Sequence, residues 1–226
     1  VVRAGETGPD GHARRGGFLP PVPLPRRMWA GGRLAFHAPL RIGEAIERIS
    51  EVRSIEPKQG RQGPLVFVRV EHRLSSKAGL AVVEEHDIVY REPPQPGARA
   101  RSAPATAPGA WQRTWAPDEV MLFRYSALTY NGHRIHYDQP YATTVEGYPG
   151  LVVHGPLLAT FMLDLVRRER PDAAVRRFAF RATAPSFAGE RLTVHGDPAA
   201  DGRNVELRVT GPDGRLAMTG SAELAA

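Results

Sequence analysis

The stretch that decides the fold is residues 152–168, which read Val152-Val-His-Gly-Pro-Leu-Leu-Ala-Thr-Phe-Met-Leu-Asp-Leu-Val-Arg-Arg168. From Leu157 to Val166 the apolar residues recur at i, i+1, i+4, i+5, i+8 and i+9. This spacing is typical of an amphipathic helix with a broad apolar face. Basic residues and then Pro171 close the pattern, as expected at the end of a helix. We therefore expect one long helix over residues 157–168.

Strand-like segments lie on both sides of this helix, separated by turn sequences such as Ser75-Ser-Lys-Ala-Gly79 and Gly211-Pro-Asp-Gly214. Each segment has β-branched and aromatic residues in rough alternation, which favours antiparallel strands. The expected strands are residues 33–37, 45–55, 65–74 and 80–90 before the helix, and 178–184, 191–196, 205–210 and 216–223 after it. Residues 120–128 are expected to be helical or extended. The proline-rich residues 18–25 predict an extended segment packed on a surface.

The two halves of the chain repeat a short pattern. Arg33-Leu-Ala-Phe-His-Ala38, followed by Gly43-Glu44, recurs as Arg177-Phe-Ala-Phe-Arg-Ala182, followed by Gly189-Glu190. Looser matches between later strands follow in the same order. We interpret the pattern as a duplicated unit of one helix and an antiparallel sheet, which is an α+β fold.

The composition in the middle of the chain predicts a boundary between these units. Residues 93–110 are rich in Pro, Ala and Gly and offer nothing to bury, as in a linker. The predicted halves are residues 1–92 and residues 111–226. Only the second half has a long amphipathic helix before its strands. If the halves are duplicates, the first helix is expected upstream of Val1.

Composition also excludes several kinds of site and partner. The chain has 226 residues and no cysteine, which excludes disulfides, thiolate metal sites and a cysteine nucleophile. Its net charge is +6, but the arginines are scattered rather than aligned, which argues against nucleic-acid binding. No apolar run suits a membrane span or a secretory signal, so a cytoplasmic location is expected. A phosphate-bearing ligand such as coenzyme A fits the mild positive charge.

Residues 131–138 gather polar side chains shortly before the helix. His136 can accept and return a proton near neutral pH, which makes it the candidate general base. Asn131 cannot act as a base, but its amide can hold a water molecule or a carbonyl group. Asn131-Gly132 is equally typical of a plain turn, so both roles stay open. His133 is a candidate substrate contact.

Gly155 is the candidate for binding a developing negative charge. It stands before Pro156, which suits the first turn of a helix because no N–H is needed there. A free N–H at a helix N-terminus, aided by the helix dipole, stabilises a thioester oxygen that becomes an enolate. The alternative is a glycine chosen only for the geometry of the helix start.

The other charged residues of this region are weaker candidates. Arg134 and Arg124 are placed to bind a substrate carboxylate, although Arg134 and Asp138 could equally form a surface ion pair. His133 and His136 lack the carboxylate pattern of a known metal site, so no metal is expected. Nucleotide-binding loops and Gly-x-Ser-x-Gly motifs are absent from the sequence, and no cofactor is expected.

These residues resemble a known family. Thr129-Tyr-Asn-Gly-His-Arg-Ile-His136 and Val152-Val-His-Gly155 resemble the signature of the MaoC-like (R)-specific enoyl-thioester hydratases and dehydratases of the hot-dog fold. That signature reads Ser-Gly-Asp-x-Asn-Pro-Ile/Leu-His, followed by Ile-Val-His-Gly. Residues 18–31, 84–92 and 123–138 are closer to the subgroup of mitochondrial-type 3-hydroxyacyl-thioester dehydratases and mesaconyl- and itaconyl-CoA hydratases. The resemblance covers most of the chain.

The resemblance implies a double hot dog, in which each half is an antiparallel sheet wrapped on a central helix and the site lies between the halves. His136 takes the place of the family's catalytic histidine, and Gly155 that of its oxyanion-hole glycine. The family's catalytic aspartate falls on Asn131. His136 would then be the main base, while Asn131 places the water.

The expected function is therefore a hydro-lyase that adds or removes water across C2=C3 of an acyl-CoA thioester. The acyl group is expected to be mesaconyl or itaconyl, with its carboxylate on Arg134 or Arg124. One alternative is a fatty-chain 3-hydroxyacyl-thioester dehydratase. Another is a non-catalytic acyl-CoA-binding module, because Asn131 replaces an aspartate. A homodimer is compatible with the sequence, which does not fix the oligomer.

Overall fold

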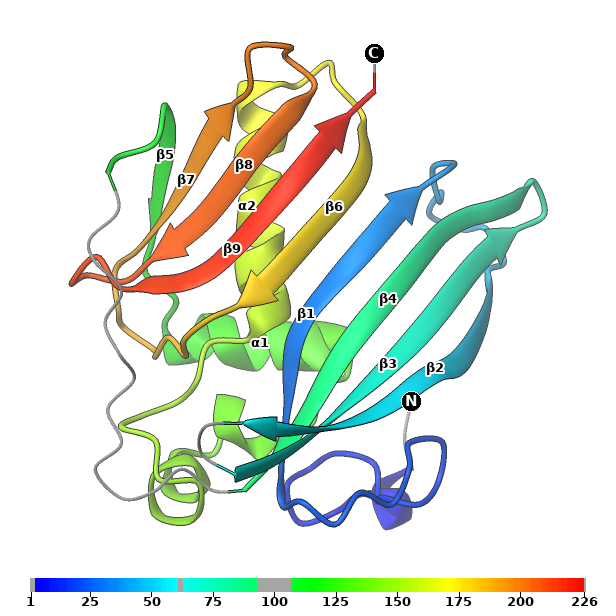
Figure 1. Ribbon diagram of the computed structural model, residues 1–226, viewed down its shortest axis with the longest axis vertical. Helices are drawn as coiled ribbons and strands as arrows, with labels where there is room; N and C mark the ends of the chain where they lie inside the picture. Colours follow the sequence, from blue (N-terminus) through cyan, green and yellow to red (C-terminus); the bar gives the residue numbers. More distant parts are fainter. Residues whose placement is uncertain (1–2, 61–62, 93–106, 226) are drawn as a thin grey trace.

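A computed structural model describes residues 3–60, 63–92 and 107–225, which form one antiparallel sheet with helices on one side (Figure 1). The strands are β1 (Arg26–Phe36), β2 (Glu47–Gly60), β3 (Gly63–Ser76), β4 (Gly79–Arg91), β5 (Trp111–Trp115), β6 (Val175–Ala182), β7 (Leu192–Pro198), β8 (Asn204–Thr210) and β9 (Leu216–Leu224). The α-helices are α1 (Glu119–Thr129) and α2 (Gly155–Glu169). Single turns form η1 (Ala4–Glu6), η2 (Arg134–His136) and η3 (Tyr141–Val145). The fold is α+β, as expected.

The nine strands follow the order β2-β3-β4-β1-β6-β9-β8-β7-β5. The order β1, β4, β3, β2 on one side of the β1–β6 pair matches β6, β9, β8, β7 on the other, which agrees with the predicted duplication. The repeated segments meet at this junction, with Leu34 opposite Phe178 and Ala35 opposite Arg177. The two halves therefore share one hydrogen-bonded sheet.

Helix α2 packs on what we call the inner face of the sheet, against β5, β7, β8 and β9. Its buried side chains are Leu157, Leu158, Ala159, Phe161, Met162, Leu165 and Val166, which include the predicted apolar face. Phe178 and Phe180 of β6 belong to the same buried core. Burial of each large apolar side chain contributes about 1.5–3 kcal/mol. This core fixes the start of α2, where the candidate site lies.

The proline-rich segment before β1 is extended and packs on the first half of the sheet, as predicted. Its apolar cluster consists of Val22, Leu24, Val68, Val70 and Tyr90. Arg15 stabilises the segment, because its Nη1 donates a hydrogen bond to the carbonyl oxygen of Val22 at 3.1 Å. Between residue 3 and β1, the single turn η1 is the only helical element of the described chain. The helix expected upstream of Val1 stays a prediction.

Strand β1 begins at Arg26, earlier than the predicted residue 33. Gly31 and Gly32 are typical of a loop when read in the sequence, but they lie inside the strand. Glycine is needed there because β1 passes very close to β6. A Cβ atom at Gly32 would lie 2.9 Å from the ring of Phe180. The short edge strand β5 was not predicted, whereas α1 agrees with the helical interpretation of residues 120–128.

The predicted linker is described only in part. Residues 93–106 lie outside the described residues, so the boundary between the halves stays a prediction. Of the remainder, Gly109 donates its N–H to Nδ1 of His195 at 3.3 Å.

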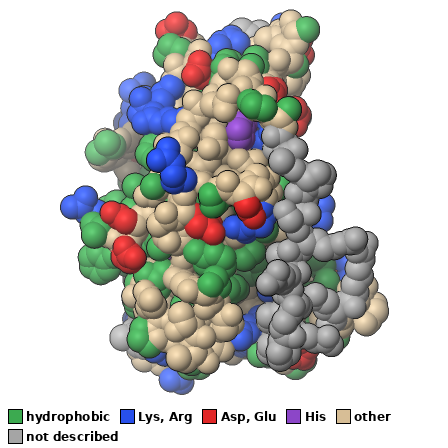
Figure 2. All heavy atoms as spheres, turned by 90° about the vertical axis from the view of Figure 1, so that its left-hand side faces the viewer, with side chains coloured by type: hydrophobic (Ala, Val, Ile, Leu, Met, Phe, Trp, Pro, Cys, Tyr) green, Lys and Arg blue, Asp and Glu red, His purple; other side chains and the backbone are tan. Residues whose placement is uncertain are grey.

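On the surface seen in Figure 2, Lys and Arg side chains are interspersed with acidic and hydrophobic ones rather than gathered in a stripe. In the part of the chain that the structure describes, no helix has the length and apolar character needed to cross a membrane.

Candidate active site

A tight turn after α1 brings the polar cluster back toward α2. Asp118 caps the start of α1, because its carboxylate accepts the N–H of Met121 at 2.8 Å. The helix ends at Tyr130, the only non-glycine residue among those described with a positive φ, 52°. Tyr130 stands where the family signature has glycine, which adopts this conformation without strain. Asn131 then donates its N–H to the carbonyl oxygen of Ser126 at 2.9 Å and closes the turn.

His136 has the orientation of a general base. Its Nδ1 lies 2.7 Å from the carbonyl oxygen of Val152. Because a carbonyl oxygen only accepts, Nδ1 carries the proton and Nε2 has a free lone pair. Burial lowers the pKa of His136 to about 4, although the bond to Val152 opposes the shift. The imidazole is therefore neutral, and able to accept a proton, at pH 7.

His154 holds the ring of His136 from one side. The two rings are stacked with centroids 3.7 Å apart and planes 18° apart. His154 is completely buried, and its Nε2 is hydrogen-bonded to Oγ of Ser126 at 2.9 Å. Burial, followed by the charges of His136 and His133, lowers the pKa of His154 to about 2. A neutral, fixed imidazole thus positions the candidate base.

Gly155 begins α2, and its N–H makes no hydrogen bond among the described residues. Its φ lies outside the left-handed region, and an added Cβ would meet only Cε of Met218, at 3.8 Å. Neither the backbone conformation nor packing within the protein therefore requires glycine here. Glycine does leave room for a ligand to approach the N–H closely, and its oxyanion role stays a prediction.

Asn131 performs the turn role that the sequence left open. Its Oδ1 accepts the N–H of His133 at 3.1 Å, while its Nδ2 makes no hydrogen bond within the described chain. The water-holding role stays a prediction that depends on Nδ2. The ring of His133 is edge-on to His136, with centroids 5.5 Å apart. Burial is the main cause that lowers its pKa to about 2.

The N-terminal segment adds His12, which sequence reasoning missed. The rings of His12 and His133 have centroids 4.3 Å apart. The N–H of Arg134 donates to the carbonyl oxygen of Asp10 at 2.9 Å and docks this segment on the loop. In the sequence, Gly8-Pro-Asp-Gly-His12 is a turn signal followed by an imidazole, but no spacing connects it to residues 131–138.

Neither Arg134 nor Arg124 forms a preformed binding site for a substrate carboxylate. Nη2 of Arg134 lies 2.7 Å from the carboxylate of Asp138, and its guanidinium lies over the ring of Tyr141 at 4.2 Å. Arg134 thus forms the ion pair given as the alternative. Arg124 is exposed on α1. The substrate contacts of both arginines, and of His133, stay predictions.

Two other features of the described residues lie apart from this chemistry. No group of three His, Asp or Glu side chains among them is arranged to hold a metal ion. A hollow of about 430 Å³ lies where β1 meets β6, with Arg33 and Arg177 in its lining, and contains none of the predicted site residues.

His136 stacks on His154, and the next residue, Gly155, begins a helix that packs against an antiparallel sheet. This arrangement suits a hydro-lyase of the hot-dog type. The family described as hydroxyacyl-thioester dehydratase type 2 matches residues 2–188. The chain belongs to this MaoC-like family of hydro-lyases.

Individual relatives agree with this. Mesaconyl-C(4)-CoA hydratase of Chloroflexus aurantiacus is 47% identical over 222 residues, 95% of this chain and 76% of the relative. The mitochondrial hydroxyacyl-thioester dehydratase type 2 of Schizosaccharomyces pombe is 31% identical over 204 residues, 77% of this chain and 65% of the relative. A Mycobacterium tuberculosis structure described as a double hotdog fold has a TM-score of 0.58, covering 89% of this chain and 76% of its own at 18% identity. That last likeness concerns the fold alone.

Proposed function

We propose that this protein hydrates the C2=C3 double bond of a CoA thioester of the mesaconyl-C4-CoA type. The observation that carries the chemistry is the stack of His136, whose Nε2 is free to accept a proton, on His154, the residue before the unbonded N–H of Gly155. The substrate class is supported by the 47% identity to mesaconyl-C(4)-CoA hydratase.

The proposed reaction uses these two groups in turn. Nε2 of His136 accepts a proton from water while the hydroxyl bonds to C3 of the acyl group. The π electrons move to the thioester oxygen, and the Gly155 N–H donates to the enolate that forms. His136 then protonates C2 from Nε2 and becomes neutral again. Asn131 Nδ2 donates to the oxygen of the attacking water and orients it.

We also infer that the chain is a double hot dog with its site between the halves. The mirrored strand order and the shared β1–β6 pair support two hot-dog units. His12 of the first half and His133 of the second are in ring contact, which supports a site built from both.

Dehydration of a fatty 3-hydroxyacyl thioester is the second candidate. It is supported by the similarity to the S. pombe dehydratase. The ion pair of Arg134 with Asp138 also favours it, since that guanidinium is already bound. The same acid–base residues serve both reactions, so the acyl group decides between the two candidates.

The test follows loss of enoyl-thioester absorbance with mesaconyl-C4-CoA and crotonyl-CoA on the wild type and on His136→Gln. The matched control is His195→Gln, since His195 is buried like His136 and also has one ring nitrogen hydrogen-bonded within the protein, Nε2 to Oγ1 of Thr210 at 3.0 Å. We expect faster hydration of mesaconyl-C4-CoA and a loss of about 10²–10⁴-fold in His136→Gln alone, the scale of a general base.

Other outcomes point elsewhere. Turnover of crotonyl-CoA without mesaconyl-C4-CoA supports the fatty-chain reaction. Equal activity of His136→Gln and the wild type contradicts the assigned base. Binding of both thioesters without any turnover indicates a non-catalytic module.

A further inference from the structure

Arg27 of β1 carries a nearly buried guanidinium that uses few of its donors. Its side chain is 7% exposed, and Nη2 lies 3.2 Å from Oδ2 of Asp10. Its Nε is buried and has no hydrogen-bond partner among the described residues. A guanidinium has five N–H donors, and a buried charge is costly unless these are matched. Such a side chain is suited to pair with a second anion.

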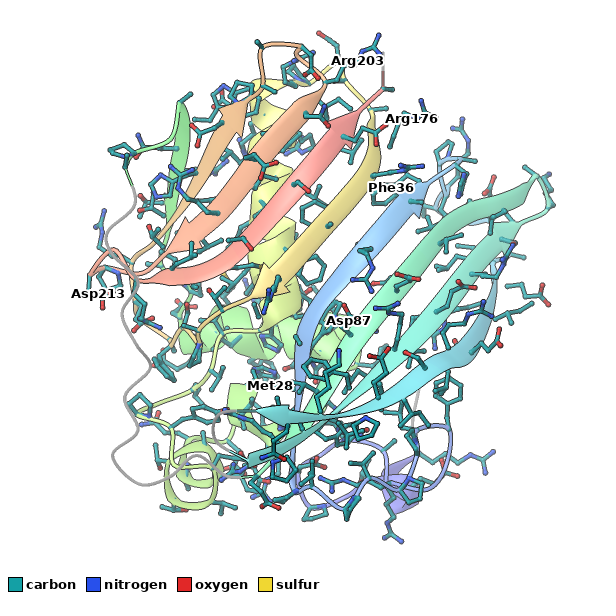
Figure 3. The ribbon with its side chains drawn as sticks, viewed as in Figure 1. Met28, Phe36, Asp87, Arg176, Arg203 and Asp213 are labelled. Carbon is teal, nitrogen blue, oxygen red and sulfur yellow. The ribbon has the colours of Figure 1, made fainter. Side chains whose placement is uncertain are left out.

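The strand register directs Arg27 to the inner face of the sheet. Arg27 is opposite Tyr90, and Trp29, two residues later, lies on the same face because strand side chains alternate. The ring of Trp29 contacts that of Phe180, 5.2 Å away, in the core under α2. Figure 3 labels Met28, between the two residues, in the lower part of β1.

The guanidinium of Arg27 lies near histidines of the candidate site. After burial, the charge of Arg27 is the largest cause that lowers the pKa of His12, to about 3. The same charge lowers the pKa of His133. Ring contacts continue from His12 to His133 and from His133 to His136. Asp10 joins Arg27 to this group of rings, since its Oδ2 lies 3.2 Å from Nη2 of Arg27 and its Oδ1 accepts the backbone N–H of His12 at 3.0 Å.

The two arginines singled out from the sequence fit this role less well. Arg134 already holds Asp138 through both Nε and Nη2, at 2.9 and 2.7 Å. Its Nη1 donates to the carbonyl oxygen of Pro9 at 3.0 Å. Arg124 is exposed on α1 and would bind an anion in water, where an ion pair contributes little.

We infer that Arg27 binds the free carboxylate of a dicarboxylic acyl thioester and thereby selects this substrate class. The inference rests on the proposed function. In methylfumaryl C4 thioesters, which mesaconyl-C4-CoA is, the carboxylate is attached to the carbon that accepts the hydroxyl. Its cation must then lie within roughly 8 Å of the base, the reach of two hydrogen bonds and the bonds between them. Arg27 is joined through Asp10 to His12, whose ring is linked by that of His133 to the ring of His136.

The test compares a substrate with the carboxylate and one without it. Initial rates are measured with mesaconyl-C4-CoA and crotonyl-CoA on the wild type, Arg27→Gln and Arg27→Lys. Arg33→Gln is the matched control, because Arg33 is also a β1 arginine paired with carboxylates, Glu85 and Asp87. In Arg27→Gln we expect kcat/KM for mesaconyl-C4-CoA to fall about 10²–10³-fold, as when one partner of a buried charge pair is removed. Crotonyl-CoA should change little, and Arg33→Gln should keep the wild-type preference.

A second measurement does not depend on Arg27→Gln folding. Methylsuccinyl-CoA and isovaleryl-CoA, saturated analogues with and without the carboxylate, are compared as inhibitors of crotonyl-CoA hydration. The wild type should bind the first more tightly, and Arg27→Lys should lose most of that difference because lysine does not offer the planar fork.

Each remaining outcome counts against the inference. Equal losses with both substrates in Arg27→Gln show a structural role. A preference for the carboxylate that survives in both variants overturns the role of Arg27 but leaves the proposed function standing. A wild type that does not prefer mesaconyl-C4-CoA overturns both.

Discussion

Gly155→Ala should separate stability from activity. An alanine Cβ at this position would meet only Cε of Met218, at 3.8 Å, which is an ordinary contact. The residue lies in the first turn of α2 without a positive φ. The added methyl group therefore strains nothing inside the protein. It does lie beside the N–H that we assign to the thioester oxygen.

The two effects have opposite directions. Alanine is favoured over glycine by up to about 1 kcal/mol inside a helix, and by less at its start. The free energy of unfolding should thus stay equal or rise slightly, and Tm should rise by at most about 4 °C for a chain of this size. The rate of hydration should fall about 10²–10³-fold, the scale for losing one oxyanion donor.

The measurements are thermal unfolding and steady-state kinetics on the same preparations. Gly150→Ala is the control, because a Cβ there meets nothing within 4 Å and φ is not positive. It should alter neither quantity. Wild-type activity in Gly155→Ala would refute the oxyanion assignment. A Tm lowered by many degrees would show that packing, rather than substrate, demands the glycine.

Three further perturbations test the surroundings of His136. Ser126→Ala removes the hydroxyl that is hydrogen-bonded to the buried His154. The free energy of unfolding, measured by urea titration, should fall by about 1–3 kcal/mol. An unchanged free energy would mean that His154 needs no partner. His12, His133, His136 and His154 have lowered pKa values in the folded protein, so the unfolded chain binds more protons below pH 6.5 and stability falls as pH drops. Each histidine contributes up to about 1.4 kcal/mol per pH unit, and equal urea midpoints at pH 7 and pH 5 would contradict their neutral burial. In Gly11→Ala, a methyl group on a residue with φ +86° would collide with the carbonyl oxygen of Gly132 and should displace His12. The control is Gly16→Ala, because Gly16 has a similar φ but only Pro21 nearby. We expect kcat/KM to fall further in Gly11→Ala than in Gly16→Ala.

Elements with strong local signals were predicted well from the sequence. The spacing of Leu157 to Val166 gave α2, and alternation gave the strands of both halves within a few residues at most ends. The start of β1 was missed because Gly31 and Gly32 signal a loop locally. These two residues are glycine because β6 approaches closely, a contact that exists only in the folded sheet. Tertiary contact overrides local preference there.

The candidate site was predictable only where it is contiguous. His136 and Gly155 lie in motifs whose residues suit the chemistry. The structure places Gly155 at the start of α2 and His136 against His154, just before that helix. His12 and Arg27 come from the other half of the chain. Their approach to residues 131–138 depends on the β1–β6 pairing and on the docking of the N-terminal segment, which no local pattern encodes.

The single sheet shared by the two halves has a consequence for how this enzyme can change. In a dimer of identical subunits, every substitution occurs twice and must serve both copies of a site. Here the strand β1, with Arg27, and the loop before α2, with His136, are separate stretches of one chain, and β1 joins the second half through its main-chain pairing with β6. With the roles proposed for Arg27 and His136, new acyl specificities can arise by substitutions in one half while the proton-transfer residue in the other stays unaltered.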